Sequence, residues 1–352
     1  MALPEKRQLG QTDERSTEAA YQRTRKTTGR RKAEGTGLPK ADLHRRKRGR
    51  DKHPKKRRSQ TIDELAKTYS RKVSMFCALF GFSKQAYFKH RQQHLKSQST
   101  ELEVRRRVLL VRRLMPKIGS RKLHYLLRSD IGIGRDRLFH LLREQGLLIF
   151  KRKKYTKTTN SRHWMRKYPN LTANLKLTRP EQLWVSDITY VDTTQDGNSY
   201  LHLVTDAYSK QIMGYELCGD MESKSTLRAL RMALGNRRYD HPLIHHSDRG
   251  LQYCSRIYVD ELERNGIMIS MTENGDPYEN ATAERINGIL KSEFGLGDVL
   301  NNLSEAKVLA KQSIAIYNSL RPHLSCKMLT PIQMHGQQEV ELKTYKKTLN
   351  KC

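Results

Sequence analysis

The sequence has few cysteines and lacks any long apolar run. Its five cysteines are odd in number and include no C-x-x-C pair, so no disulfide framework is expected. No stretch approaches the roughly 20 apolar residues that a membrane-spanning helix needs, and the first residues lack a signal-peptide core. These absences predict a soluble protein of a reducing, intracellular compartment.

Acidic residues are scarce relative to basic ones. The 352 residues include 68 Lys and Arg but only 36 Asp and Glu, which gives a formal net charge of +32. Such an excess favours a polyanionic partner, because each neutralised phosphate releases condensed counterions. Charge alone does not separate DNA from RNA or ribosome binding, but it predicts a nucleic-acid-binding protein.

Three acids stand out in this basic chain because of their local settings. Asp187 interrupts the apolar, β-branched run 183–191, which predicts a buried strand. Asp248 ends a second short strand, 243–247, and Glu284 lies in a predicted helix. Burying a carboxylate is costly unless something cationic needs it, so a divalent metal is the natural candidate.

The helix that carries Glu284 is expected over residues 279–294. Either Asp276 or Asn280 serves as its N-cap, and both positions remain open. Lys291 falls on the same polar side as Glu284, beside an apolar stripe. We expect Lys291 to contact a DNA phosphate next to the metal-binding carboxylate.

Carboxylates from two strands and one helix suit magnesium chemistry. Mg²⁺ prefers carboxylate oxygens and completes its octahedron with substrate phosphate and water. Two such ions, about 3.5–4 Å apart, stabilise the attacking and leaving oxygens of an in-line displacement. We therefore expect Asp187, Asp248 and Glu284 to hold Mg²⁺ or Mn²⁺, with two ions in the site.

Longer motifs surround these acids. They are WVSDITY at 184–190, HSDRGLQY at 246–253, NGDPYENATAERING at 274–288, YNSLRPH at 317–323 and TP at 330–331. With them the chain resembles the catalytic subunit of the insertion-sequence-three family of bacterial transposases, which is related to retroviral integrases. The likeness runs from about residue 60 to about residue 337.

The resemblance implies a ribonuclease-H-like α/β fold in which Asp187, Asp248 and Glu284 are the catalytic acids. It implies a transposase that cleaves DNA at the terminal inverted repeats of its element and transfers the freed strand to target DNA. It further implies homo-oligomers on paired DNA ends, a partner protein from an upstream reading frame, and a place in the bacterial cytosol. Two alternatives remain: a DNA-binding protein with a silent catalytic core, and a nuclease of this fold without strand transfer.

The order of predicted elements agrees with a mixed sheet. Strands expected at 200–208 and 211–218 follow the first strand through short turns, as in an antiparallel meander. The later elements alternate, with a helix at 223–234, the strand at 243–247, a helix at 255–264 and a strand at 267–271. This alternation predicts helices that cover the sheet.

Two helix-turn-helix-like units are expected ahead of the sheet. In the first, a helix over 73–80 leads through Gly81 into a helix that Ser83 caps and that ends near Arg91. A zinc site from Cys77, His90 and His94 would lack a fourth ligand and is not expected.

In the second unit, helices over 120–128 and 135–145 flank a turn. Its second helix presents outward the side chains that we expect to contact DNA, namely Arg135, Arg137, His140 and Arg143. An ordinary helical hairpin with a solvated basic face is the alternative.

The predicted domains follow from these units and from the changes of composition between them. They are a basic disordered segment at 1–60, the two helical units at 61–97 and 98–150, a basic linker at 151–173, a catalytic domain at 174–337 and a polar tail at 338–352.

Overall fold

The computed structural model describes residues 54–70, 72–149, 165–273, 280–337 and 342. They form two compact units, divided between Tyr87 and Phe88. Among these residues, none of the helices combines the length and the apolar character that crossing a bilayer requires. Most of the segment 1–60, part of the linker, residues 274–279 and most of the tail lie outside the described residues.

The first unit is built on α2 (Pro54–Thr68), α3 (Val73–Leu79) and the start of α4 (Lys84–Leu114). Its core is a small buried cluster that includes Ile62, Phe76 and Cys77. The prediction of disorder up to residue 60 is wrong for residues 54–60, because α2 begins at Pro54. Proline suits a helix start, and the apolar side of α2 packs on α3.

The predicted cap at the start of α4 is confirmed, but the predicted length is wrong. The Ser83 hydroxyl accepts the Ala86 N–H at 3.1 Å. The helix then runs for 31 residues, so the predicted end near Arg91 and the boundary at 97/98 both lie inside it. No proline or glycine interrupts this stretch, and Glu103 accepts hydrogen bonds from arginines three and four residues further along, which supports the helix.

The second unit contains a helical part and a sheet. In the helical part, α5 (Ser120–Ile131) and α6 (Arg135–Glu144) match the two predicted helices, although α5 runs three residues further than predicted, to Ile131 instead of 128. A left-handed glycine, Gly132 at φ 57°, ends α5. The apolar side of α6 is buried against α5, as the leucine spacing predicts.

The sheet has five strands in the order β3-β2-β1-β4-β5. Their bounds are β1 (Leu183–Thr193), β2 (Gly197–Asp206), β3 (Ile212–Cys218), β4 (Ile244–Ser247) and β5 (Met268–Met271). The first three pair antiparallel, while β4 pairs parallel with both β1 and β5. This mixed sheet with its opening meander is the predicted one.

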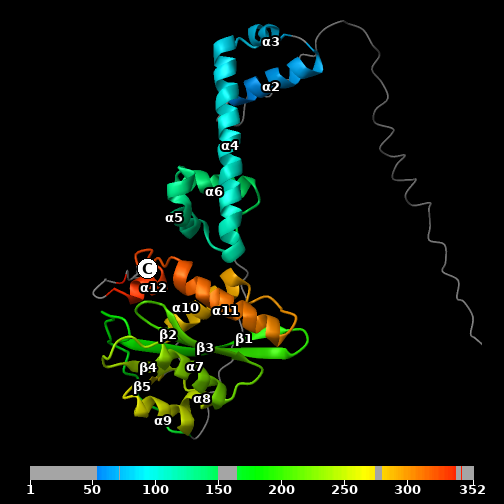
Figure 1. Cartoon of the computed structure of the whole chain (residues 1–352). Helices are drawn as coiled ribbons and strands as arrows, with labels where there is room; N and C mark the ends of the chain where they lie inside the picture. The colour runs from blue at the N-terminus through cyan, green and yellow to red at the C-terminus, as the bar shows by residue number, and fades with distance from the viewer. Residues whose placement is uncertain (1–53, 71, 150–164, 274–279, 338–341, 343–352) are drawn as a thin grey trace, which may run out of the picture. The chain divides into compact units, whose positions relative to one another are not determined.

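Helices cover both faces of the sheet (Figure 1). One face carries α10 (Ala281–Phe294) and α11 (Leu303–Leu320), and the other carries α7 (Ser223–Gly235), α8 (Leu251–Cys254) and α9 (Arg256–Arg264). Alternation along β2 explains this: Leu201 and Leu203 join the first core, while Val204 joins the second.

The matched Thr330-Pro331 motif begins a short helix, α12 (Pro331–His335). Thr330 and Gln333 form a reciprocal capping box. At the end of α12, the fully buried His335 ring contacts the Glu181 carboxylate, with Nε2 3.1 Å from Oε1. The motif therefore ties the C-terminal helix to the start of the sheet.

Candidate active site

Strand register brings Asp187 and Asp248 together. In the parallel pair formed by β1 and β4, Val185 lies opposite His246. Asp187 and Asp248 each follow two residues later, so the two acids lie side by side at the end of β4. The two strands thus deliver two carboxylates to one place.

The third acid, Glu284, comes from the first turn of α10. Two amides hold this helix against β1. The Asn287 side chain donates to Asp187 Oδ2 at 2.7 Å, and the Asn280 side chain donates to the Ser186 carbonyl at 3.0 Å. Asn287 lies one turn after Glu284, and Glu284 is near enough for its charge to act on Asp187.

The electrostatics of Asp187 reflect this convergence. Burial, the negative charge of Asp248 and, more weakly, that of Glu284 raise the pKa of Asp187 to about 7. The hydrogen bonds from Asn287 and from the Ile188 N–H act in the opposite direction and are outweighed. The neighbouring negative charges make the ionised form of Asp187 costly, and a bound cation would relieve that cost.

The donor set fits a hard divalent cation. All three predicted ligands offer carboxylate oxygens, which suit Mg²⁺ and Mn²⁺ better than soft metals. Within the described ranges, no three His, Cys, Asp or Glu side chains already stand as a closed ligand cluster. Glu284 is exposed at the start of α10, whereas both aspartates are partly buried.

A glycine lies in the turn after Asp248. The Gly250 N–H donates to Asp248 Oδ1 at 3.0 Å. A Cβ at Gly250 would lie 3.0 Å from that same oxygen and 3.1 Å from Gln252 Oε1. The missing side chain therefore lets the backbone approach and orient the carboxylate.

A buried polar layer lies behind the acids. His245 Nε2 contacts the Ser186 hydroxyl at 2.7 Å and the Tyr258 hydroxyl at 2.9 Å. Burial lowers the pKa of His245 to about 3, so the ring is neutral. Such a histidine supports the strands that carry the acids and does not serve as a base.

The predicted DNA-contacting side chains of α6 are all exposed. Arg135 pairs with Asp136 at 2.9 Å, Arg137 donates to Ser97 Oγ at 3.2 Å, His140 lies 3.3 Å from Glu144, and the Arg143 guanidinium lies 5.0 Å from the Phe139 ring centroid. Lys291 is partly buried in the last turn of α10. Their contacts with DNA remain predictions.

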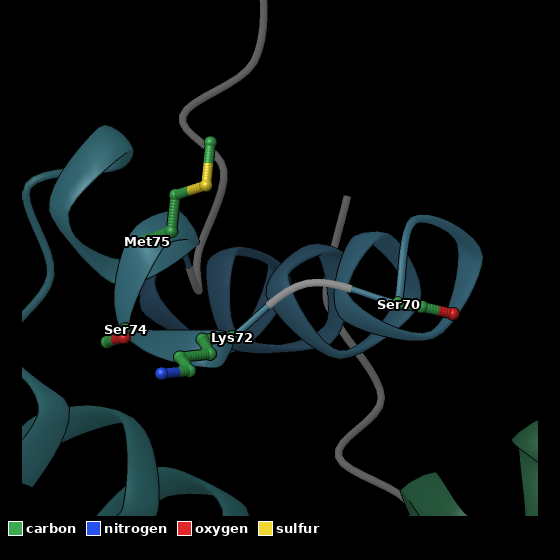
Figure 2. Close-up of a pocket in the computed structure, with 4 residues that line it drawn as sticks. All are labelled: Ser70, Lys72, Ser74 and Met75. Atoms are coloured by element: carbon green, nitrogen blue, oxygen red, sulfur yellow. The ribbon is translucent and has the colours of Figure 1, made fainter.

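The first unit contains a surface depression. It lies at the start of α3 and is lined by Ser70, Lys72, Ser74 and Met75 (Figure 2). None of the described residues that line it is a carboxylate.

Asn287 and Asn280 hold the site together, a role that the sequence pattern did not predict for either; Asn280 was a candidate N-cap only, and it is the N-cap of α10. Asn287 lies three positions after Glu284 on the polar side of the helix, which was the available signal. Asparagine is common on helix surfaces, so spacing alone did not distinguish a site residue from a solvated one. The structure shows that both asparagines are buried.

A mixed sheet with acids on two adjacent strands and on a covering helix defines the class of ribonuclease-H-like integrase cores. Two family models, both described as "Integrase core domain", match residues 178–277 and 265–331. The predicted fold class is thereby confirmed.

The chain is also similar to proteins of bacterial insertion sequences. It is 36% identical over 261 residues to the "Insertion element IS600 uncharacterized 31 kDa protein" of Shigella sonnei, covering 72% of this chain and 95% of that protein. It is 35% identical to the "Transposase for insertion sequence element IS629" of Shigella sonnei, covering 58% of this chain and 68% of that protein. The "Transposase InsF for insertion sequence IS3A" of Escherichia coli K12 is 32% identical, with 56% and 68% covered.

The chain belongs to the insertion-sequence-three family of transposases, which are polynucleotidyl transferases with an integrase core. Among solved structures, it is similar to the HTLV-2 integrase catalytic core domain in complex with magnesium. That similarity has 21% identity and a TM-score of 0.36, and it covers 45% of this chain and 97% of that one.

Proposed function

We propose that this protein is a magnesium-dependent transposase that cuts its own element's DNA ends and joins them to target DNA. The observation that carries the proposal is the convergence of Asp187, Asp248 and Glu284 from β1, the end of β4 and α10. Their mutual repulsion supports a site built for cations.

The chain's own residues would hold and orient the metal ligands. Asp187 and Asp248 would bind Mg²⁺ or Mn²⁺, and Glu284 would complete the set for two ions. When bound, the ions supply charge stabilisation to the attacking and leaving oxygens of a phosphoryl transfer. The Asn287 amide and the Ile188 N–H each take one oxygen of Asp187, which fixes the plane of that carboxylate.

The proposed reaction has two steps at one site. In the first step, water attacks a phosphodiester at the element's end, and the bond to the 3′ oxygen breaks to leave a 3′-OH. In the second step, that hydroxyl attacks a phosphodiester of target DNA, forming one phosphorus–oxygen bond as another breaks. The number of phosphodiester bonds is unchanged in the second step, so no external energy source is needed.

The partners follow from the same proposal. The basic α6 side chains Arg135, Arg137, His140 and Arg143, together with Lys291, would contact the terminal inverted repeats or target DNA. The net charge of +32 supports a DNA partner. Homo-oligomers on paired ends, an upstream-frame partner protein and action in the bacterial cytosol belong to the proposal as well.

Substitution of the acids tests the proposal. Asp187→Asn, Asp248→Asn and Glu284→Gln should each lower Mg²⁺-dependent cleavage of a terminal-repeat duplex by about a thousandfold, since metal ligation supplies several kcal/mol. DNA binding should be retained. Asp192→Asn, which changes an exposed acid of the same strand, is the matched control and should cleave normally. Undiminished cleavage by Asp187→Asn would show that Asp187 is not a catalytic acid.

A further inference from the structure

A buried ion cluster lies at the end of α10 opposite Glu284. The Glu293 carboxylate accepts two hydrogen bonds from Arg321, Nε to Oε2 and Nη2 to Oε1, both at 2.8 Å. Lys122 Nζ donates to the same Oε1 at 3.1 Å. The Arg321 side chain is 1% exposed, and those of Lys122 and Glu293 are 11% and 14% exposed.

The three residues come from three different elements. Glu293 lies in the last turn of α10, Arg321 follows α11, and Lys122 belongs to α5 of the helical part. The backbone joins them too, because the Lys117 N–H donates to the Glu293 carbonyl at 3.0 Å. The cluster therefore connects the catalytic helix to the helices that precede the sheet.

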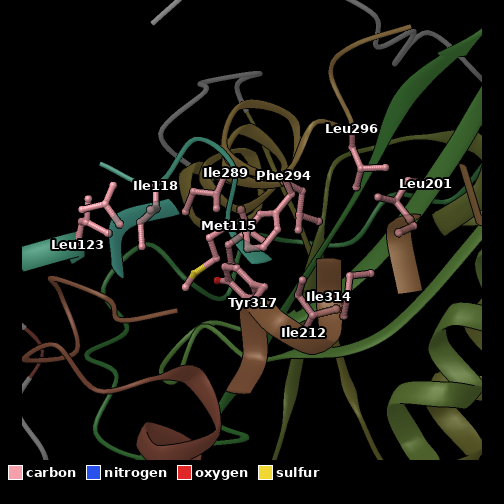
Figure 3. Packing of buried hydrophobic residues seen from close by; sticks show 14 of the residues in the cluster. Met115, Ile118, Leu123, Leu201, Ile212, Ile289, Phe294, Leu296, Ile314 and Tyr317 are labelled. Carbon is pink, nitrogen blue, oxygen red and sulfur yellow. The ribbon is translucent and has the colours of Figure 1, made fainter. Parts of the chain in front are cut away.

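Apolar packing surrounds this connection. Met115, Ile118 and Leu123 from the helical part share one buried cluster with residues of α10 and α11 (Figure 3). Leu290 and Phe294 are the α10 members nearest Glu293 in sequence. Packed interiors transmit displacement because they hold few voids, so a movement of α5 must be felt by α10.

The two cations of the cluster contribute differently to the neutralisation of Glu293. Burial alone would raise the pKa of Glu293, but hydrogen bonding to Arg321 and the charges of Arg321 and Lys122 hold it below its ordinary value. Burial and the nearby Arg321 charge lower the pKa of Lys122 to about 8. Arg321 therefore already neutralises Glu293, and a buried ammonium adds little net stability. What Lys122 adds is a fixed position of α5 relative to α10.

The contact of Lys122 with Glu293 can affect the active site because Glu293 and Glu284 lie on the same helix. Glu284 and Glu293 are nine residues apart on α10, about 13 Å along the axis of a straight helix. The Asn287 contact with Asp187 lies between them. A shift at the Glu293 end therefore changes where Glu284 meets the two aspartates.

We infer that Lys122 is a positioning residue. Through Glu293 and Arg321, it couples the position of α5 and α6 to the placement of Glu284. DNA held by α6 would then help to fix the third catalytic acid, so that an unbound protein is poorly assembled for cleavage. This inference rests on the proposed function, since it takes DNA as the ligand of α6 and Glu284 as a catalytic acid.

The variant Lys122→Met tests the coupling because it removes the ammonium and leaves the Glu293–Arg321 pair in place. Lys117→Met is the matched control: it removes an exposed pair at the same junction, in which Lys117 Nζ lies 2.7 Å from Asp298 Oδ2. Hydrogen exchange of the α10 amides is measured with and without a terminal-repeat duplex. Thermal unfolding verifies folding, and Lys122→Ala serves if methionine is not accommodated.

In the wild type and in Lys117→Met, DNA should slow exchange in the first turns of α10, and this protection should be lost in Lys122→Met. Cleavage by Lys122→Met should fall about 10–100-fold in kcat with KM for DNA nearly unchanged, as for residues that orient metal ligands. Lys122→Arg should restore both readouts.

The coupling is wrong if DNA fails to protect α10 in the wild type or still protects it in Lys122→Met. The exchange readout is independent of catalysis. If protection depends on Lys122 but no variant or wild type cleaves DNA, the coupling stands and the proposed transposase activity fails.

Discussion

The two ends of α10 are held in different ways. Near Glu284, neutral amides of Asn280 and Asn287 bind the helix to β1. At the other end, Glu293 is held by two buried cations. Amides can orient a carboxylate without cancelling its charge, which a metal-binding acid must keep. Glu293, at the other end of α10, does not have to keep its charge for a metal, so ion pairs with cations can fix that end in place.

Arg321→Met should cause the largest loss of stability. It leaves Glu293 with only Lys122, and breaking a buried pair costs about 3–5 kcal/mol. The free energy of unfolding in urea measures the loss. In the triple variant Arg321→Met/Glu293→Gln/Lys122→Met much of it should return, because none of the three buried charges remains. A loss below about 1 kcal/mol in the single variant would show that the cluster is not a structural anchor.

Asn287→Leu should affect the active-site end of α10 and spare most of the stability. Losing the amide that orients Asp187 should lower Mg²⁺ affinity or cleavage by about 10–100-fold. Metal titrations of the cleavage rate measure the change. Asn265→Leu, at an exposed position after α9, is the control. Equal activity of the two variants would mean that Asn287 does not orient the site.

In the metal-free protein, ionisation of Asp187 should lower the stability as the pH rises. Burial and the charge of Asp248 raise the pKa of Asp187 to about 7, above the value of about 3.9 of an unfolded aspartate. Between these values the folded state keeps a proton on Asp187 that the unfolded state has lost, so the contribution of Asp187 to the free energy of unfolding falls from about pH 4 to about pH 7 and then levels off.

Comparison of melting temperatures at pH 5 and pH 8 without metal tests this linkage. Asp187→Asn should flatten the pH dependence, and Mg²⁺ should raise the wild-type melting temperature at pH 8 more than that of the variant. Parallel profiles for the two proteins would contradict the raised pKa.

The smallest effect is expected at the exposed edge of the distal junction. Lys117 and Asp298 are 42% and 59% exposed in their side chains, so solvent screens their attraction. Lys117→Met should change the free energy of unfolding by less than about 1 kcal/mol. A change as large as that of Arg321→Met would mean that exposure does not distinguish the two pairs.

The sheet could be predicted from the sequence because its signals are local. The β-branched run around Asp187 and the short apolar segment before Asp248 mark β1 and β4 directly. The length of α4 could not be predicted in the same way. Its middle is charged and has a weak apolar period, so the sequence predicts the boundary between two helical units there.

In the candidate site, too, the local signals could be predicted from the sequence and the long-range contacts could not. Local motifs mark the three acids, but the Asn287 contact with Asp187 joins residues 100 positions apart and appears only in the folded chain. The Lys122–Glu293 pair is separated by 171 positions. Nothing local in either segment specifies its partner, because burial rather than sequence spacing creates the need for pairing.

Strand transfer is the measurement that tests the central claim most directly. Purified protein is incubated with Mg²⁺, a labelled terminal-repeat duplex and target DNA, and the products are resolved on a denaturing gel. The account predicts joined strands that disappear on chelation and in Asp187→Asn but persist in Asp192→Asn. Nicked ends without any joined strand, even with the upstream-frame protein added, would contradict it and indicate a nuclease of the same fold.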